Sequence, residues 1–381
     1  MTMGSGTGLG VGLIGTGFMG KTHALAWRNV KAVMGGVMGA VPAPRLEVLC
    51  DTPDRAEPMA DQFGFARATD DWRALCADPA VDVVSITTPN GLHHPMALEA
   101  IGNGKHVWCE KPMALTLAQA EEMAAAAEAA GVVTMVGYNY LKNPAFAHAQ
   151  KLVAEGTIGR VFQFRGWVDE DYQADPDLPW TWRAKLADAG LGALGDIGSH
   201  LVSMAHGIMG GIDSLVADMQ TVYATRPLPD GSGTGEVENE DTAGVLLRFA
   251  SGAQGSLAIS RAAWGRKSRL GFEVHGTKGM IIFDQERMNE LQLYLNEGDR
   301  ATQGFRTILT GPAHPPYAEF CPAPGHQLGF NELKVIECAA FLRGIAGLES
   351  PAPSFADALR IERVIHAIAD SARAGGKRVS P

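Results

Sequence analysis

Residues 194–200 read LGDIGSH, which places a carboxylate and an imidazole four positions apart. Positions i and i+4 share one face of a helix, so Asp196 and His200 can point in the same direction. A helix N-terminus stabilises the charged form of an aspartate, and such an aspartate can orient an imidazole that accepts a proton. We therefore predict that His200 is a general base toward a hydroxyl group and that Asp196 supports it. The alternative is a helix-capping aspartate beside a structural histidine.

Lys111 is the third residue that we predict to be catalytic. It stands at the end of the expected strand within 105–112 and lies between Glu110 and Pro112. An ammonium group at a strand end can hydrogen-bond a reacting oxygen and stabilise the negative charge that develops on it. The alternative is a solvated turn residue, which is the usual role of a lysine before proline.

Further residues are expected to contact the substrate. The segment VDEDYQADPDLPWTWR (168–183) combines acidic, aromatic and arginine side chains, which suit the hydroxyl groups and C–H faces of a sugar. Arg183 is the best candidate within it, and a solvated acidic loop is the alternative. The complete set of predicted substrate-binding residues is Lys111, Tyr140, Arg183, Asp196, His200 and His326.

The N-terminal part carries a glycine pattern of the type G-x-G-x-x-G, formed by Gly15, Gly17 and Gly20. An apolar run, Val11 to Ile14, precedes it and a helical pattern follows it. In that context the glycines allow a tight turn, a close approach of the backbone to a pyrophosphate, and close packing of helix and strand. The N-terminus of the helix then offers free N–H groups to the phosphates. These features predict a dinucleotide-binding site.

Asp51 ends the next expected strand, RLEVLCD, and it lies 31 positions after Gly20. The usual spacing is about twenty residues, so we expect residues 34–44 to form an inserted loop. A carboxylate at this strand end can accept hydrogen bonds from the ribose hydroxyls and repel an additional phosphate. We therefore predict NAD rather than NADP as the cofactor. A turn-capping aspartate is the alternative.

Three later apolar runs predict further strands of the same sheet, within 81–90, 105–112 and 132–140, with helical patterns between them. Alternating strands and helices imply an α/β fold with a doubly wound parallel sheet, which binds ligands beyond the carboxyl ends of its strands. Polar residues recur at those ends. The predicted cofactor-binding residues are Gly15, Gly17, Phe18, Met19, Gly20, Asp51, Thr88, Pro89, Asn90, His93, Glu110, Lys111 and Asn139.

The pattern changes near residue 160 to alternating apolar and polar residues joined by short turns, followed by two helical segments. This arrangement is typical of an antiparallel α+β domain. We therefore expect two domains, a nucleotide-binding domain at 1–140 and a substrate-binding and oligomerisation domain at 141–381.

Composition excludes several classes of function. The net charge is −10 without a block of lysines and arginines, which makes nucleic acids and anionic membranes poor partners. Five scattered cysteines indicate reduced thiols and a cytoplasmic location. We expect no membrane span, no signal peptide and no metal site.

Six stretches together resemble the Gfo/Idh/MocA family of NAD(P)-dependent oxidoreductases, and they span most of the chain: GLIGTGFMGKTHA, TPNGLHH, EKPMALT, GYNY, EGTIGRV and GALGDIGSH. The resemblance implies a Rossmann domain followed by a domain with a large, open, mostly antiparallel sheet that commonly pairs between subunits. It also implies catalytic roles for Lys111, Asp196 and His200, and a Lys111–Pro112 bond that is often cis. In relatives, a loop like the one holding His326 reaches the active site of a neighbouring subunit.

Other stretches, such as ADPDLPWTWR and RTILTGPAHP, resemble a smaller group of scyllo-inositol/L-glucose and levoglucosan dehydrogenases within the family. The resemblance to the inositol/L-glucose type is the closer one. It implies oxidation of a secondary hydroxyl of a cyclic polyol or sugar by a homo-oligomer, a dimer or a tetramer. Three alternatives stay open: levoglucosan or another sugar as substrate, an NAD-dependent glycoside hydrolase, and a non-catalytic NAD-binding sensor.

Overall fold

The computed structural model describes residues 8–39 and 41–381, which form two compact units. The first unit contains the chain up to residue 139 together with residues 328–359, and the second contains residues 140–327 and 360–381. The sequence-based division into 1–140 and 141–381 differs from these units at two places: Tyr140 falls in the second unit, and residues 328–359 return to the first.

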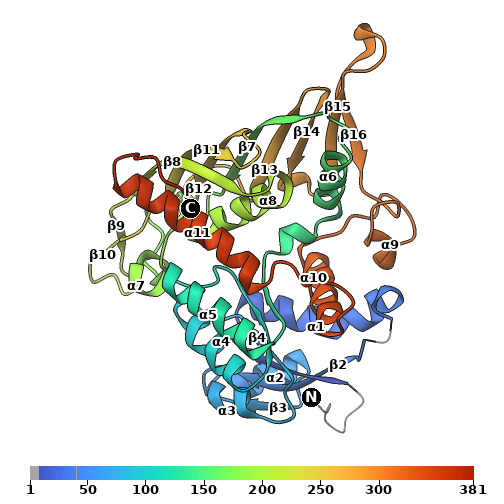
Figure 1. Cartoon of the computed structure of the whole chain (residues 1–381). Helices are drawn as coiled ribbons and strands as arrows, with labels where there is room; N and C mark the ends of the chain where they lie inside the picture. The colour runs from blue at the N-terminus through green and yellow to red at the C-terminus, as the bar shows by residue number, and fades with distance from the viewer. Residues whose placement is uncertain (1–7, 40) are drawn as a thin grey trace. The chain divides into compact units, whose positions relative to one another are not determined.

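The first unit is built on a six-stranded parallel sheet with the order β3-β2-β1-β4-β5-β6. Figure 1 labels three of its strands, β2, β3 and β4. This order, with its switch point between β1 and β4, is that of the doubly wound dinucleotide fold. The predicted parallel sheet is thus confirmed. Its strands are β1 (Leu9–Ile14), β2 (Pro44–Cys50), β3 (Arg67–Thr69), β4 (Val83–Ile86), β5 (His106–Cys109) and β6 (Thr134–Val136).

Local signals in the sequence set the ends of the helices that connect these strands. Asp71 accepts hydrogen bonds from backbone N–H groups at the start of α3, and Thr116 does the same at the start of α5. Gly64 and Gly131 end α2 and α5 in the left-handed conformation. The helices are α1 (Phe18–Met38), α2 (Ala56–Phe63), α3 (Trp72–Ala77), α4 (His93–Gly102), α5 (Leu117–Ala130) and α10 (Phe330–Ile345).

The prediction of a loop at 34–44 is wrong for residues 34–38, because α1 continues to Met38. Val30, Met34 and Met38 are all buried at i, i+4 spacing, at 0%, 3% and 0% exposure. This apolar stripe extends the helix through two glycines whose intrinsic preference is unfavourable.

Residues 328–359 belong to the first unit because α10 packs against α1. The rings of Trp27 and Phe341 lie 6.4 Å apart, and those of Phe18 and Phe330 lie 5.4 Å apart. Trp27 and Phe341 are 1% and 0% exposed. A buried aromatic pair removes a large apolar area from water, which explains why a helix so late in the sequence completes the nucleotide-binding unit.

The second unit contains an eight-stranded sheet with the order β16-β15-β14-β13-β7-β12-β11-β8. Every neighbouring pair is antiparallel except β7 and β12, so the predicted mostly antiparallel sheet is confirmed. The strands are β7 (Val161–Asp169), β8 (Ile212–Gln220), β11 (Thr242–Phe249), β12 (Gln254–Ser260), β13 (Arg269–Gly276), β14 (Gly279–Asp284), β15 (Glu290–Leu295) and β16 (Arg306–Leu309).

Helices α6 (Pro144–Ala154) and α8 (Ser199–Met209) pack against this sheet (Figure 1). Between sheet and helices lies an aromatic core, in which the rings of Phe164, Phe272 and Phe283 stack at 5.7 and 5.5 Å. The remaining elements are α7 (Leu186–Ala189), α9 (Tyr317–Phe320), the small sheet of β9 (Thr225–Pro227) and β10 (Thr234–Glu236), and α11 (Phe355–Arg373).

Two further expectations can be compared with the structure. All five cysteines are free thiols. Among the helices of the described residues, none has the length and apolar character required to cross a membrane.

Candidate active site

The turn after β1 has the geometry that its glycines predict. Gly15 has a φ of 95°, and a Cβ atom there would lie 2.8 Å from the Thr87 carbonyl oxygen. A Cβ on Gly20 would lie 2.2 Å from the Gly15 carbonyl oxygen. The Thr87 hydroxyl donates to the Ile14 and Gly15 carbonyls at 3.0 and 2.9 Å. The ends of β1 and β4 are therefore joined at the switch point, with space only for glycine.

The N-terminus of α1 is suited to an anion. Its N-cap is Gly17, no side chain of the described residues caps it, and its first turn contains no acidic residue. A Cβ at Gly17 would meet nothing within 4 Å, and the Phe18 side chain is 70% exposed. Open N–H groups at the end of a 21-residue helix fit the pyrophosphate of a dinucleotide.

Asp51 follows β2 directly and turns back toward the glycine turn. Its Oδ2 accepts hydrogen bonds from the Thr16 N–H at 2.7 Å and from the Thr16 hydroxyl, and its Oδ1 accepts from the Thr52 N–H at 2.7 Å. Burial alone would raise the pKa of Asp51, but these hydrogen bonds and the charge of Arg55 together lower it by a larger amount. The net shift of the pKa is therefore downward. The carboxylate is thus kept ionised where a ribose would bind.

Arg55 is a residue that the sequence analysis did not assign to the site. Its guanidinium lies 3.6 Å from Asp51 Oδ2 and donates to the Thr16 hydroxyl at 2.8 Å. The i, i+4 spacing of Asp51 and Arg55 was the available signal.

The ends of β4 and β6 supply further polar groups to the same edge. Thr88 and Asn90 are half-buried, Pro89 is exposed, and Asn139 is 2% exposed. Within the described part of the chain, the Asn139 side-chain nitrogen is buried without a hydrogen-bond partner. Because an unmatched buried donor is costly, this amide fits an acceptor on a bound ligand. Together with the glycine turn and Asp51, it makes the edge suitable for NAD.

His93, another predicted cofactor-binding residue, is 1% exposed. Its Nδ1 lies 2.8 Å from the Pro112 carbonyl oxygen and its Nε2 lies 2.9 Å from the Thr88 carbonyl oxygen. Both ring nitrogens therefore face backbone carbonyls rather than a ligand. Because burial lowers the pKa of His93, the neutral ring donates to only one of the two carbonyls. His93 connects the end of β4 to the residue after Lys111.

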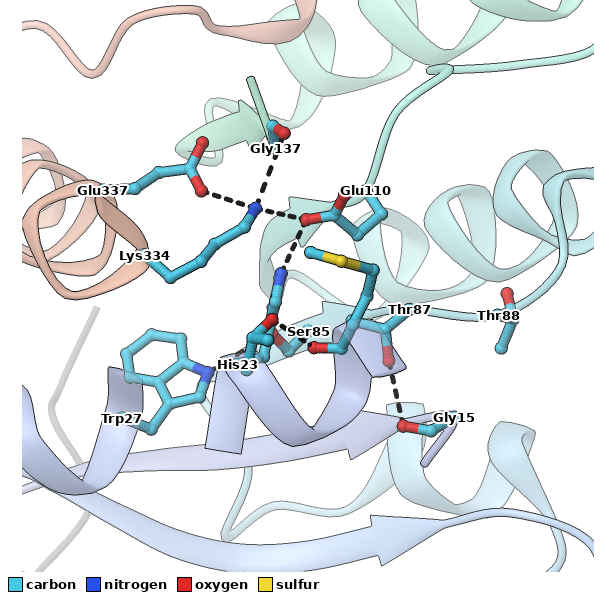
Figure 2. A network of polar contacts seen from close by, with 12 residues as sticks. Gly15, His23, Trp27, Ser85, Thr87, Thr88, Glu110, Gly137, Lys334 and Glu337 are labelled. Atoms are coloured by element: carbon cyan, nitrogen blue, oxygen red, sulfur yellow. Dashed lines mark hydrogen bonds and ion pairs between the residues drawn. The ribbon is translucent and has the colours of Figure 1, made fainter. Parts of the chain in front are cut away.

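Glu110 is held in a buried polar network (Figure 2). Its Oε1 accepts a hydrogen bond from His23 Nε2 at 2.8 Å and forms an ion pair with Lys334. Lys334, on α10, is 0% exposed and also pairs with Glu337 at 2.7 Å. The Glu110 side chain is thus directed into the core. The contact of Glu110 with the cofactor stays a prediction, and the main chain of this residue would have to make it.

The pKa shifts in the network give each of its members a defined charge. Burial lowers the pKa of His23 to about 4, so its imidazole is neutral at pH 7 and donates from Nε2 to Glu110. Its Nδ1 then accepts from the Ser85 hydroxyl at 2.7 Å. Burial raises the pKa of Glu110, but the charge of Lys334 and the hydrogen bond from His23 lower it well below its usual range. Burial lowers the pKa of Lys334, and the two carboxylates more than reverse this.

Lys111 follows Glu110 directly and is half-buried, and the Lys111–Pro112 peptide bond is cis, as the family resemblance implied. Its neighbours on both sides are fixed, because Glu110 joins the network and the Pro112 carbonyl meets His93. The backbone of Lys111 is therefore held at the carboxyl edge of the sheet.

In the second unit, Asp196 lies in a single π-helical turn (Leu194–Gly198) that leads directly into α8. The expected helix is thus present, with a wider first turn of the kind that is frequent at functional sites. The Glu240 carboxylate accepts a hydrogen bond from the Leu194 N–H at 2.8 Å, and the Glu240 carbonyl accepts from the Ala193 N–H at 2.9 Å. A Cβ on Gly192 would lie 2.0 Å from that carbonyl oxygen. Glu240 and Gly192 therefore fix the turn that carries Asp196.

Aromatic side chains surround the Asp196–His200 turn. His200 is 7% exposed, and its ring meets the Tyr140 ring edge-on at a centroid distance of 4.7 Å. Asp196 Oδ2 accepts a hydrogen bond from the Tyr172 hydroxyl at 2.8 Å. The structure thus brings together three predicted residues, Tyr140, Asp196 and His200, and adds Tyr172, which the sequence analysis left unassigned within its acidic and aromatic segment.

The two other predicted substrate residues are exposed. Arg183 lies on a short 3-10 turn, where its guanidinium stacks over the Trp182 ring at 4.6 Å. His326 lies in the loop before α10, and its carbonyl accepts a hydrogen bond from the Tyr317 hydroxyl. No group of three or more potential metal ligands occurs among the described residues.

Comparison with known families gives two matches that together cover most of the chain. Residues 9–138 match an oxidoreductase family with an NAD-binding Rossmann fold. Residues 146–282 match the GFO/IDH/MocA C-terminal domain.

Several relatives are named as dehydrogenases of sugars or polyols. The levoglucosan dehydrogenase of Pseudarthrobacter phenanthrenivorans is 41% identical over 96% of this chain and 96% of that protein. The myo-inositol 2-dehydrogenase of Thermotoga maritima is 30% identical over 77% of this chain and 80% of that protein. Among solved structures, a levoglucosan dehydrogenase in complex with NADH and levoglucosan is 40% identical, with a TM-score of 0.93 over 98% of this chain and 99% of that chain.

Proposed function

Because the chain belongs to the Gfo/Idh/MocA family of oxidoreductases, we propose that it is an NAD-dependent dehydrogenase that oxidises a secondary hydroxyl of levoglucosan or a closely related cyclic sugar. The observation that carries the proposal is the occurrence, in one chain, of a dinucleotide edge and an Asp–His turn bordered by aromatic rings. Oxidation of an alcohol requires a hydride acceptor and a proton acceptor, and these two features would supply both.

The proposed roles follow from the chemistry of the side chains. His200 takes the proton of the substrate hydroxyl, and Asp196, one helical turn away, stabilises the imidazolium that forms. Lys111 donates a hydrogen bond to the reacting oxygen and stabilises its developing charge. Bound NAD supplies the hydride acceptor, and the residues that would hold it are the glycine turn, the start of α1, Asp51 and Asn139. We propose that Lys111 meets Asp196 and His200 around one alcohol oxygen.

The choice of sugar differs from the expectation based on the sequence. The inositol/L-glucose type was the closer resemblance there, with levoglucosan as an alternative. Identity of 41% over 96% of the chain favours levoglucosan, whereas the inositol dehydrogenases of Thermotoga maritima and Bacillus subtilis reach 30% and 26% over 77% and 75% of it. The Tyr140 ring beside His200 would suit the C–H face of a compact sugar ring.

The test is a screen for NADH formation, followed by absorbance, with levoglucosan, scyllo-inositol, myo-inositol, L-glucose and D-glucose. We expect the highest kcat/KM with levoglucosan. Replacement of His200 by alanine should leave NAD binding intact and lower turnover by at least about a hundredfold. Undiminished turnover of this variant would contradict the role of His200. Consumption of a glycoside without net NADH would favour the glycoside hydrolase, and NAD binding without any turnover would favour the sensor.

We also propose a homo-oligomer, a dimer or a tetramer, that works in the cytoplasm. One face of the eight-stranded sheet presents a row of aligned small and apolar residues, namely Gly244, Ala258, Trp167 and Gly271. Leu246 lies on the same face and is 62% exposed. Such a face is suited to pairing with a second copy. The free thiols support a reducing compartment.

A further inference from the structure

Tyr172 donates the hydrogen bond that Asp196 Oδ2 accepts, at 2.8 Å. We propose that Tyr172 is a positioning residue of the reaction, an inference that rests on the proposed function. The Tyr172 hydroxyl fixes the Asp196 carboxylate and keeps it ionised, so that the proton taken from the substrate remains on His200.

The backbone around Tyr172 is held in place on both sides. The Glu170 N–H donates to the Ser260 carbonyl at 2.9 Å, and the Gln173 N–H donates to the Arg261 carbonyl at 3.0 Å. The segment is therefore tied to the end of β12 and the residue that follows it. A phenol ring on such a segment delivers its hydroxyl to one place, which is what orientation of a carboxylate requires.

The direction of the effect follows from the chemistry of the pair. A hydrogen bond donated to a carboxylate stabilises its charged form and lowers its proton affinity. Without the hydroxyl, Asp196 becomes more basic and competes with His200 for the proton. Tyr172 itself remains a donor, since burial and the nearby Asp196 charge raise the pKa of its phenol.

Other titratable groups of the second unit bear on this pair. His200 lies one turn away, and the charges of Arg261 and Glu170 act on the Tyr172 hydroxyl. Arg261 is held by Asp241 at 2.8 Å, so its charge stays in place when Tyr172 is changed. Removal of the hydroxyl therefore acts mainly on Asp196 and, through it, on His200.

The chain offers a matched control for this hydroxyl. Tyr223 donates its hydroxyl to the Ala174 carbonyl at 2.9 Å, so it contacts the same segment as Tyr172 but a neutral acceptor. Tyr223→Phe removes one tyrosine hydroxyl and its hydrogen bond to this segment, and leaves the hydrogen bond to Asp196 in place. Comparison of Tyr172→Phe with Tyr223→Phe thus separates an effect on the reaction from a loss of stability.

The experiment measures kcat, KM and the pH dependence of kcat/KM for both variants and the wild type, with NADH affinity and melting temperature alongside. In Tyr172→Phe we expect kcat to fall about tenfold with little change in KM, the loss of about one hydrogen bond to a charged group. The acidic limb of kcat/KM should move to higher pH by about half a unit to one unit, because a more basic Asp196 raises the pKa of His200. Tyr223→Phe should leave kcat and the pH profile unchanged.

The outcomes are distinguishable. Normal wild-type turnover with a Tyr172→Phe profile that overlays the wild type would overturn the role of Tyr172 alone. Equal losses in both variants would also overturn it, because they would indicate a merely structural hydrogen bond. A wild-type enzyme that forms no NADH with any of the sugars would overturn the proposed function itself.

Discussion

Replacement of Lys334 by methionine tests the buried network of the first unit. Methionine keeps an unbranched, largely apolar side chain of comparable size and lacks the charged ammonium group. The Lys334 side chain is 0% exposed, and its Nζ contacts the Glu110 carboxylate and, at 2.7 Å, that of Glu337. Both carboxylates have 5% exposure or less, so neither can exchange its lost partner for water.

The structure sets the size of the effect. Removal of one partner from a buried ion pair costs about 3–5 kcal/mol, because the remaining charge is left in a medium of low polarity. Total stabilities are only about 5–15 kcal/mol, so the loss is a large fraction. The loss should be greatest at neutral pH. The charge of Lys334 is the largest influence that lowers the pKa of Glu110, so the pKa rises when that charge is removed, and protonation at lower pH then relieves part of the cost.

The assay is urea denaturation at pH 7.5 and pH 5, followed by tryptophan fluorescence, since Trp27 and Trp108 lie beside the network. The double variant Glu110→Gln/Lys334→Met should recover much of the stability, because it removes both charges together. Lys151→Met is the control, as the Lys151–Glu155 pair is exposed and should contribute less than about 0.5 kcal/mol. A loss below 1 kcal/mol for Lys334→Met, or no recovery in the double variant, would refute the reasoning.

Three further predictions concern the same unit. Gly137→Ala should lower the stability by about 1–3 kcal/mol, measured by denaturation, because its Cβ would lie 2.2 Å from Glu110 Oε1 and 2.9 Å from Lys334 Nζ. The free energy of unfolding of the wild type should fall by up to about 3 kcal/mol as the pH drops from 6.5 to 4. In this range His23 binds a proton in the unfolded chain but not in the folded one, where its pKa is about 4. His23→Gln should flatten this pH dependence in the same assay. Asp51→Ala should weaken NAD binding about tenfold or more and narrow the preference over NADP, measured by fluorescence titration of both cofactors.

The sequence predicted the parts of the fold that local patterns determine. The glycine turn, the strand that ends at Asp51 and the alternating segments after residue 160 each follow from backbone sterics or from side-chain periodicity within a few residues. The exceptions have non-local causes. The extension of α1 depends on a buried stripe through Met34 and Met38, and the return of 328–359 depends on aromatic contacts between α1 and α10.

The same distinction between local sequence patterns and non-local contacts applies to the residues of the candidate site and its surroundings. Asp51, Asp196 and His200 could be proposed from the sequence, because each stands at a strand end or at an i, i+4 spacing beside glycines. Lys334 could not, because it lies 224 positions from Glu110 in a helix where a lysine ordinarily faces solvent. Its signal would have been a lysine on the apolar face of that helix, where no charge is expected without a partner.

The burial of Glu110 also bears on why the strand end before Lys111 is built from charges. An apolar side chain at Glu110 could fill the same core, and such replacements of buried ion pairs are often neutral or stabilising. A charged hydrogen-bonded pair, however, has one satisfied geometry, whereas apolar packing tolerates small shifts along the strand. With Glu110 fixed by Lys334 and His23, and Pro112 fixed by His93, the main chain of Lys111 has little freedom left. A main chain held in this way keeps the Cα atom of Lys111 in one place, and this would limit the entropy cost of the role proposed for its ammonium group.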